Sequence, residues 1–435
     1  MAMERVKQLV SHMSPASKGV AALQRKSPDD VVITMAVRSP LCRAKGGGFM
    51  YTKSDELLAE MFKQAIAHSG IDPALVGDIT VGTVLSPSAT YEARTAALAA
   101  GFPESVPVQT INRFCSSGLM AVTDISNKIR AGQIEVGLAV GMESMSQNPD
   151  KGAPASSDSI KANQAACDSV MPMGWTSENV AGDFNISRQE MDEWASISFQ
   201  RAEHADKSGY FANEIVPFTA YEKPDPETGK RATKVVSKDD GIRAGTTAEK
   251  LLKIRPAFPQ WKPSQTTGGN ASQITDGTAA VLLMTRRKAE ELGLAILAKH
   301  VTTAVAGLAP RVMGIGPSIA IPQVLQQAGI TTDDVDLFEA SGCAVSYARA
   351  ESSWRNADQR GVRIDDGVLC AQAGSRPCEV EMSNCADGLG ASARATGARQ
   401  IATGLNELAR RKGKILVTSM CIGTGMGAAS VFVGE

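Results

Sequence analysis

Residues 65–82 read AIAHSGIDPALVGDITVG, and residues 324–341 read VLQQAGITTDDVDLFEAS. In both segments a helical pattern stops at a glycine, an isoleucine follows, and an aliphatic strand begins after an aspartate. The two copies start about 260 residues apart, and a repeat of this kind indicates two similar α/β halves in one chain.

Apolar runs alternate with helical patterns along the rest of the chain, which is typical of βαβ units and predicts a largely parallel sheet. We expect strands at 30–36, 78–84, 106–111, 136–141, 279–284 and 414–420. We expect helices at 55–69, 91–100, 116–131, 187–209, 286–292, 320–329 and 396–412.

The domain boundaries follow from these patterns. We assign 28–147 with 274–296 to the N-terminal half and 297–435 to the C-terminal half. Residues 148–273 are richer in Ser, Lys, Asp and Pro, and we interpret them as an insertion between strands.

Composition narrows the class of protein. The 45 Lys and Arg residues nearly balance the 46 Asp and Glu residues, so no strong field favours nucleic acid or an anionic membrane. Aromatic residues make up 5% and glycine occurs 40 times, which favours an α/β enzyme scaffold over a β-sandwich. Eight cysteines without a signal-peptide pattern indicate a reducing compartment and free or catalytic thiols. No apolar run approaches the roughly 18 residues that a membrane-spanning helix needs.

The segment INRFCSSGLMAV at 111–122 brings Cys115 from a strand to the start of a helix. Unpaired N–H groups and the helix dipole at such an end stabilise a thiolate and lower the pKa of a thiol. Cys115 is therefore a candidate nucleophile. The alternative is a small buried hydrophobic residue, which is the commoner role for a cysteine chosen at random.

The segment SMCIGTGMGAA at 419–429 ends a strand at Cys421 and continues with three glycines. Glycines of this kind let backbone N–H groups converge on a developing anion, and a cysteine at a strand end is accessible for proton transfer. Cys421 is a candidate acid/base, with a glycine-rich turn that carries a passenger thiol as the alternative.

These two segments resemble the thiolase family, and the resemblance extends along the chain. Four further segments follow in the family's order: DVVITMAVRSP at 30–40, VGMESMSQNP at 140–149, MPMGWTSENVA at 171–181 and GGNASQITDGTAA at 268–280. The agreement covers about 28–339 and 396–435, and TSENVA is most similar to the peroxisomal 3-ketoacyl-CoA members.

The resemblance implies a five-layered αβαβα fold of two duplicated halves, with 148–273 as a loop domain that binds CoA. It implies thiolytic cleavage of a 3-ketoacyl-CoA to acetyl-CoA and a shortened acyl-CoA in fatty-acid β-oxidation. Cys115 matches the nucleophile that carries the acyl group, and Cys421 matches the acid/base. Met173 and Ser272 match positions that line the pantetheine site, for which a core methionine and a turn serine are the alternatives. Acyl-CoA and CoA enter as substrates, no other cofactor is implied, and a homodimer is expected.

The chain departs from the family after Phe338. A thiolase continues there with an Asn-Glu-Ala-Phe segment and later a Gly-His-Pro-Leu-Gly segment, whose Asn holds a water in an oxyanion hole and whose His activates the nucleophile. FEASGCAV and ADGLGAS stand in this region instead, with Asp387 or Ala391 in the place of the His. The four histidines of the chain, at 12, 68, 204 and 300, all precede it.

Composition changes across the same stretch. Only seven of the 56 residues at 340–395 are Leu, Ile, Val or Phe, which is below the level of a packed core. Two explanations of this segment are open. It is either an altered reading frame or retained intron, or it is a divergent insertion. Its Cys370, Cys378 and Cys385 are spaced unlike the short Cys-x₂-Cys knuckles of structural zinc, so we expect no metal site.

The first 27 residues are basic and read as a targeting leader. Arg5, Val6, His12 and Met13 resemble the N-terminal peroxisomal targeting pattern, which implies a peroxisomal import receptor as partner and the peroxisome as location. An amphipathic helix or frayed tail is the alternative.

Two functions are consistent with the sequence as a whole: a working thiolase, or a catalytically impaired CoA-binding or assembly subunit on the same fold.

Overall fold

The computed structural model describes residues 19–341, 380–381 and 396–435. The helices are α2 (Val20–Leu23), α3 (Ser54–Ser69), α4 (Ala89–Ala100), α5 (Ser117–Arg130), α6 (Asp158–Lys161), α7 (Gln164–Ser169), α8 (Met173–Asp183), α9 (Arg188–Lys207), α10 (Ala248–Leu252), α11 (Arg286–Glu291), α12 (Pro317–Ala328) and α14 (Thr396–Arg411). Short 3-10 turns are η1 (Pro73–Leu75), η2 (Tyr210–Asn213), η3 (Pro310–Ile315) and η4 (Thr332–Asp334).

The strands are β1 (Val31–Arg38), β2 (Cys42–Arg43), β3 (Asp78–Gly82), β4 (Val108–Ile111), β5 (Val136–Ser144), β6 (Phe218–Tyr221), β7 (Thr233–Val236), β8 (Thr275–Thr285), β9 (Ala298–Gly307), β10 (Leu337–Ser341), β11 (Val380–Glu381), β12 (Ile415–Ile422) and β13 (Met426–Gly434). The expected strands and helices of the sequence all appear, with ends displaced by a few residues at most.

Two five-stranded arrangements of the same topology form the core. The order β4-β3-β5-β8-β1 in the N-terminal half matches β11-β10-β12-β13-β9 in the C-terminal half, and β1 joins β9 through two residue pairs. The repeat lies where this symmetry requires, because its two copies contribute β3 and β10, each second from the outer edge. Both copies end their helix at a glycine in the left-handed region, Gly70 with φ 64° and Gly329 with φ 69°, which explains the shared glycine.

The expectation of a largely parallel sheet is wrong. Parallel pairing joins β3 to β4 and β5, and β10 to β11 and β12, whereas β8 runs antiparallel to β1 and β5, and β13 antiparallel to β9 and β12. The reason is local in the C-terminal half, where β12 and β13 are joined directly by a tight turn. A tight turn reverses the chain, and parallel strands need a longer crossover.

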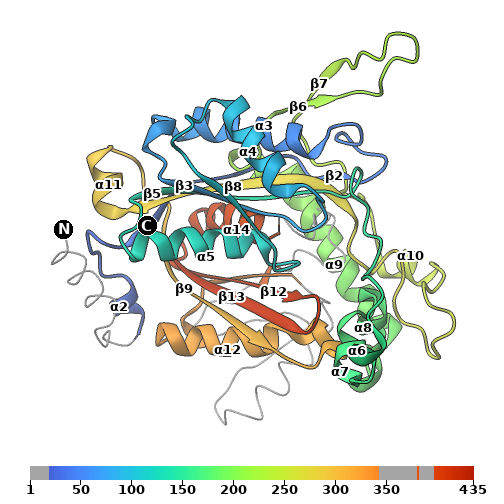
Figure 1. Cartoon of the computed structure of the whole chain (residues 1–435). Coiled ribbons are helices and arrows are strands. Elements are labelled where there is room, and N and C mark those ends of the chain that lie inside the picture. Colours follow the sequence, from blue (N-terminus) through green and yellow to red (C-terminus); the bar gives the residue numbers. More distant parts are fainter. Residues whose placement is uncertain (1–18, 342–379, 382–395) are drawn as a thin grey trace.

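The elements stack in five layers (Figure 1), as the resemblance implies. Helices α3 and α4 cover the outer face of the N-terminal sheet, α12 covers the outer face of the C-terminal sheet, and α5 and α14 lie between the two sheets. The two central helices approach closely at Gly397, where an added Cβ would stand 2.3 Å from the backbone N of Leu119. Their apolar faces form one buried cluster with both sheets.

Residues 148–273 connect β5 to β8 and contain α6 to α10 and the β6-β7 hairpin. Val180, Ile186 and Met191 of this segment form a buried cluster, and the partly buried Val312 and Ile315 of η3 pack against it. The insertion is thus packed against the C-terminal half as well as covalently attached to the N-terminal half.

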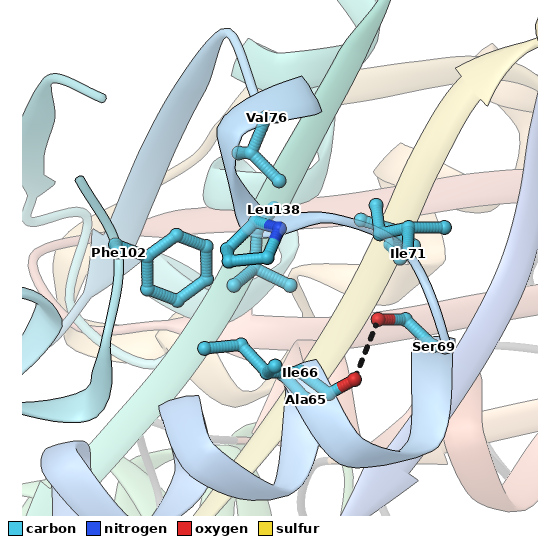
Figure 2. Close-up of a pocket in the computed structure, with 9 residues that line it drawn as sticks. Ala65, Ile66, Ser69, Ile71, Val76, Phe102 and Leu138 are labelled. Atoms are coloured by element: carbon cyan, nitrogen blue, oxygen red, sulfur yellow. Dashed lines mark hydrogen bonds between the residues drawn. The ribbon is translucent and has the colours of Figure 1, made fainter. Parts of the chain in front are cut away.

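A small apolar cavity lies under the end of α3 (Figure 2). It is lined by Ala65, Ile66, Ser69, Ile71, Pro73, Val76, Phe102, Leu138 and Leu282. The Ser69 hydroxyl donates to the Ile66 carbonyl at 3.2 Å, so the polar edge of the cavity is satisfied within α3. The first copy of the repeat supplies most of this wall, and the cavity is a packing feature of the N-terminal core.

Candidate active site

The segment between β4 and α5 presents Cys115. Cys115 is half-buried and immediately precedes Ser116, the N-cap residue of α5. Phe114 has φ 44°, a left-handed backbone that side-chain-bearing residues rarely adopt. The turn is held by hydrogen bonds from the Phe114 amide to Asn112 Oδ1 at 3.0 Å and from the Arg113 amide to Ser117 Oγ at 2.9 Å. Such a conformation costs energy and persists only where its surroundings fix it, which is common at functional sites.

Strand β3 sets the position of this end of α5. A Cβ added at Gly82 would lie 2.2 Å from the Ser117 carbonyl oxygen and 2.7 Å from the Gly118 nitrogen. Only a glycine at the end of β3 lets the first turn of α5 come this near.

Cys421 is the penultimate residue of β12 and is also half-buried. It pairs with Gly427 across the antiparallel ladder, and the connection to β13 contains Thr424 with φ 71° and Gly425 with φ 89°. A positive φ at a β-branched residue is an outlier, so the turn after Cys421 is strained like the turn before Cys115.

The two turns and Met173 meet at one place. A Cβ added at Gly423 would lie 3.6 Å from the Phe114 ring and 3.8 Å from Met173 Cε. Phe114 is 39% exposed and Met173 is 44% exposed, so this part of the site is open to solvent. The structure therefore brings together the segments that carry Cys115, Cys421 and Met173, three of the four predicted site residues. These segments come from the N-terminal half, the C-terminal half and the insertion.

Helix α8, which begins at Met173, is anchored from both sides. The buried Glu178 carboxylate accepts backbone N–H groups from Gln265 at 3.0 Å and Thr266 at 2.7 Å. Asn179 donates to the Arg311 carbonyl at 3.0 Å in the C-terminal half. The Glu-Asn pair of TSENVA thus positions the helix, a role that sequence reasoning missed although the motif was singled out.

Ser272 lies on an exposed part of the segment that precedes β8, and its hydroxyl contacts the Gln273 carbonyl at 3.4 Å. The segment is shaped by the buried Asn270, which donates to Asp192 Oδ1 and to the Gln265 carbonyl, both at 2.9 Å. Among the described residues, Ser272 makes no hydrogen bond to Phe114, Met173 or Gly423, so its predicted binding role stays a prediction.

His300 is remote from Cys115. Its Nδ1 lies 3.1 Å from Arg130 Nη2 at the last residue of α5, and its Nε2 contacts Thr303 and Ser430 hydroxyls. The 14 residues of α5 separate its two ends by about 20 Å at roughly 1.5 Å per residue. Burial and the neighbouring Arg130 guanidinium hold the pKa of His300 well below its usual range.

Two other histidines of the described chain lie on helices outside this meeting point. His68 is exposed near the end of α3, with Nδ1 3.1 Å from the Gln64 carbonyl. His204 is on α9, and its ring meets Tyr210 edge-on at 5.7 Å. His12, Asp387 and Ala391 lie outside the described residues, as do Cys370, Cys378 and Cys385.

Within residues 19–341, 380–381 and 396–435, no group of three or more His, Cys, Asp or Glu side chains is placed to hold a metal ion. In the same part of the chain, no helix combines the length and the apolar character needed to cross a membrane.

Comparison with known proteins identifies the class. Residues 31–287 match the N-terminal domain of thiolase, and residues 294–434 match its C-terminal domain. The chain belongs to the thiolase family.

The similarity extends over the full length of individual relatives. The chain is 45% identical over 438 residues to the peroxisomal 3-ketoacyl-CoA thiolase of Yarrowia lipolytica, covering 100% of both chains. Its structure is similar to the dimeric peroxisomal thiolase of Saccharomyces cerevisiae, with a TM-score of 0.81, 38% identity, and coverage of 96% of this chain and 100% of that one. Human mitochondrial 3-ketoacyl-CoA thiolase in complex with CoA gives a TM-score of 0.76 at 31% identity, over 93% and 98% of the two chains.

Proposed function

We propose that Cys115 and Cys421 carry out thiolytic cleavage of a 3-ketoacyl-CoA. Full-length similarity to peroxisomal 3-ketoacyl-CoA thiolases gives the chain this activity, an acetyl-CoA C-acyltransferase step of peroxisomal β-oxidation. The observation that supports the two roles is the close approach of Gly423 to Phe114 and Met173, because it brings the turns next to both cysteines side by side.

In the first half-reaction, the Cys115 thiolate attacks the C3 ketone carbonyl, and the bond between C2 and C3 breaks. The acyl group stays on Cys115 as a thioester, while the leaving acetyl-CoA enolate takes a proton on C2 from the Cys421 thiol. The resulting Cys421 thiolate then removes the proton from the thiol of a second CoA. That CoA attacks the acyl thioester, which releases the shortened acyl-CoA and returns Cys115 as a thiolate. A paired nucleophile and acid/base divides one difficult step into two easier ones.

The insertion at 148–273 is the part to which we assign CoA, with Met173 and Ser272 along the pantetheine arm. Support comes from Met173, which is exposed at the meeting point of the two turns while its helix is fixed by Glu178 and Asn179. The structural relative in complex with CoA supports the ligand class.

A direct test is acylation by acetoacetyl-CoA, followed by intact-protein mass spectrometry. The wild-type chain gains one acetyl group, and Cys115→Ala gains none while its affinity for CoA stays close to that of the wild type. Acetylation of Cys115→Ala at the wild-type rate would refute the assignment.

A second candidate function is a catalytically impaired subunit that still binds CoA. The observation that favours it is the position of the histidines in the described part of the chain. His68 bonds within α3, His204 packs on Tyr210, and His300 lies between Arg130 and Ser430. Steady-state thiolysis separates the two: CoA binding without turnover supports the impaired subunit, and turnover at ordinary enzyme rates rejects it.

We also propose a homodimer. The dimeric yeast relative supports it, and so does β4, an edge strand whose four residues are all half-exposed and which pairs only with β3 in the described residues. An edge of this kind offers unpaired backbone groups to another strand. Light scattering at micromolar concentration tests it: Thr110→Pro should give monomers, and an unchanged mass would place the interface elsewhere.

The leader at 1–27 is the proposed signal for the peroxisomal import receptor; residues 1–18 of it lie outside the described chain. Fusing residues 1–27 to a fluorescent protein tests the signal in a host cell with peroxisomes. Punctate fluorescence that depends on Arg5 and His12 supports it, and diffuse fluorescence contradicts it.

A further inference from the structure

Arg38, the last residue of β1, has its guanidinium fully buried at the root of the insertion. Its Nε donates to Glu214 at 2.6 Å, and its two terminal nitrogens donate to the two oxygens of Asp239 at 2.7 and 2.9 Å. The guanidinium also lies 5.2 Å from the centre of the Phe211 ring. Phe211, Glu214 and Asp239 all belong to the insertion, so one side chain of the N-terminal half binds it at three points.

The backbone reinforces the same junction. The Arg38 amide donates to the Glu214 carbonyl at 2.8 Å, and the Val216 amide donates to the Arg38 carbonyl at 2.9 Å. Asp239 accepts the Leu41 amide at 2.7 Å in addition to the guanidinium. Two segments of the insertion, one before the β6-β7 hairpin and one after it, are therefore fixed to the end of β1.

The C-terminal half enters through α14. The Thr403 hydroxyl donates to the same Glu214 oxygen as Arg38, at 2.9 Å. Glu214 is 1% exposed and thus joins three parts of the chain: the N-terminal half, the C-terminal half and the insertion. We call Arg38, Glu214, Asp239 and Thr403 the clasp.

Helix α9 connects the clasp to α8. At one end, Ala202 and Phe211 pack with Leu41 beside the clasp. At the other end, Met191 packs with Val180 and Ala181 of α8, the helix that begins at Met173. The stretch of α9 from Met191 to Ala202 therefore links the clasp to α8, the helix that presents Met173 for the pantetheine arm.

The buried charges of Arg38, Glu214 and Asp239 indicate that the clasp positions the insertion rather than adding stability to the fold. One guanidinium faces two carboxylates, and all three side chains are at most 1% exposed. Removing such charges from water costs more than a well-packed apolar contact would, so buried ion pairs add little net stability. A planar guanidinium that grips a carboxylate with two parallel hydrogen bonds instead fixes direction and register.

We propose that Arg38 is a positioning residue: the clasp sets the orientation of the insertion, and thereby of its CoA-binding residues, relative to Cys115. This proposal rests on the proposed function, in which the insertion binds the CoA arm. Under this proposal, changing Arg38 slows acylation of Cys115 by substrates that carry the CoA arm and leaves acylation by substrates without this arm unchanged.

The experiment compares acetylation of Cys115 by acetyl-CoA and by the acetyl thioester of N-acetylcysteamine, which has the thioester without the nucleotide arm. The variant is Arg38→Lys, which keeps the charge but loses the paired hydrogen bonds to Asp239. Thr403→Val is a milder variant that removes only the hydrogen bond from α14. Arg287→Lys is the matched control, since Arg287 forms an exposed ion pair with Asp29.

For Arg38→Lys we expect the preference for acetyl-CoA over the short thioester to fall by up to about 10²-fold, the loss that a misplacement of roughly 1 Å can cause. Thr403→Val should shift the preference in the same direction by less, and Arg287→Lys should leave it unchanged. A general loss of folding would lower both rates together. An unchanged preference in Arg38→Lys, or an equal change in Arg287→Lys, overturns the proposal.

Calorimetric titration with CoA gives a readout that needs no acylation. Weaker CoA binding by Arg38→Lys, but not by Arg287→Lys, supports the clasp even if acylation is slow. If the wild-type chain is acetylated by neither thioester and binds no CoA, the proposed function fails. If the wild type binds CoA and Arg38→Lys binds it equally well, the clasp alone fails.

Discussion

The close approach of β3 to α5 makes Gly82→Ala a sharp test of how Cys115 is positioned. The new methyl group would lie 2.2 Å from the Ser117 carbonyl oxygen and 2.3 Å from its carbon. Unbonded atoms rest about 3.5 Å apart, so the first turn of α5 must move by roughly 1 Å or more. The neighbours are backbone atoms rather than the end of a flexible side chain, so no rotamer change can relieve the clash.

Overpacking of this kind typically costs about 1 to 3 kcal/mol of folding free energy. A shift of roughly 1 Å at a reacting group can cost about 10²-fold in rate. We therefore expect Gly82→Ala to remain folded but less stable. Its rate of Cys115 acylation should fall much further than the small increase in unfolded protein can explain.

Urea denaturation followed by circular dichroism measures the stability, and mass spectrometry measures Cys115 acetylation by acetyl-CoA. Gly182→Ala in α8 is the matched control, because a Cβ added there meets nothing within 4 Å. It should keep the wild-type rate and gain about 0.5 to 1 kcal/mol, since alanine favours a helix over glycine. Wild-type stability and acetylation in Gly82→Ala would show that the end of α5 is not held by β3.

Three further outcomes are expected. Cys421→Ala should still accept an acyl group slowly from a simple thioester but lose carbon–carbon cleavage of acetoacetyl-CoA; equal loss of both half-reactions contradicts the division of roles. Burial alone would raise the pKa of Glu435, but hydrogen bonds from Arg286 and Lys26 outweigh it and lower the pKa from 4.5 to about 2. The stabilisation from this carboxylate is complete above pH 4.5 and is lost as the pH falls toward 2, so urea titrations should show Glu435→Gln less stable than the wild type at pH 7, with the gap closing on acidification. Replacing 340–395 by a thiolase segment with the Asn and His motifs should raise turnover by orders of magnitude, because a positioned base is worth about 10² to 10⁴-fold and an oxyanion-hole donor about 10² to 10³-fold; ordinary thiolase rates in the unmodified chain would contradict this.

The duplicated architecture was readable from the sequence because the repeat combines features with a physical cause. A glycine in the left-handed region ends each helix, and the strand after it takes the same place in each half. Strands β9 and β13 were not predicted. β9 contains Lys299, His300, Thr302 and Thr303, which break the apolar pattern, and β13 begins in the glycine-rich run after Cys421. Strand direction was also hidden, because it depends on connections and not on residue pattern.

The candidate site was predictable as a set of segments but not as a geometry. The motifs indicate Cys115, Cys421 and Met173, and the structure brings their segments close together at Gly423. The residues that hold those segments were not recognised. Glu178 satisfies the backbone of 265–266, a pairing of positions that are far apart in the chain. Every buried carboxylate needs hydrogen-bond donors, but the local sequence around Glu178 does not show that its donors are the amides of 265–266.

The position of His300 bears directly on how Cys115 becomes a thiolate. Its imidazole is held at the far end of α5 by Arg130, a guanidinium that is itself retained by the His300 and Val301 carbonyls at 2.7 and 2.9 Å. Moving this ring to Cys115 would break those contacts and carry it along about 20 Å of helix, so His300 cannot replace the missing base. The thiol that the site itself offers is Cys421 on β12, two residues before Gly423, which lies close to Phe114. In the proposed cycle Cys421 begins as a thiol, so the proton of Cys115 leaves to water before acylation. Cys421→Ala should then keep its slow acylation from the simple thioester, and loss of that acylation would instead assign the proton to Cys421.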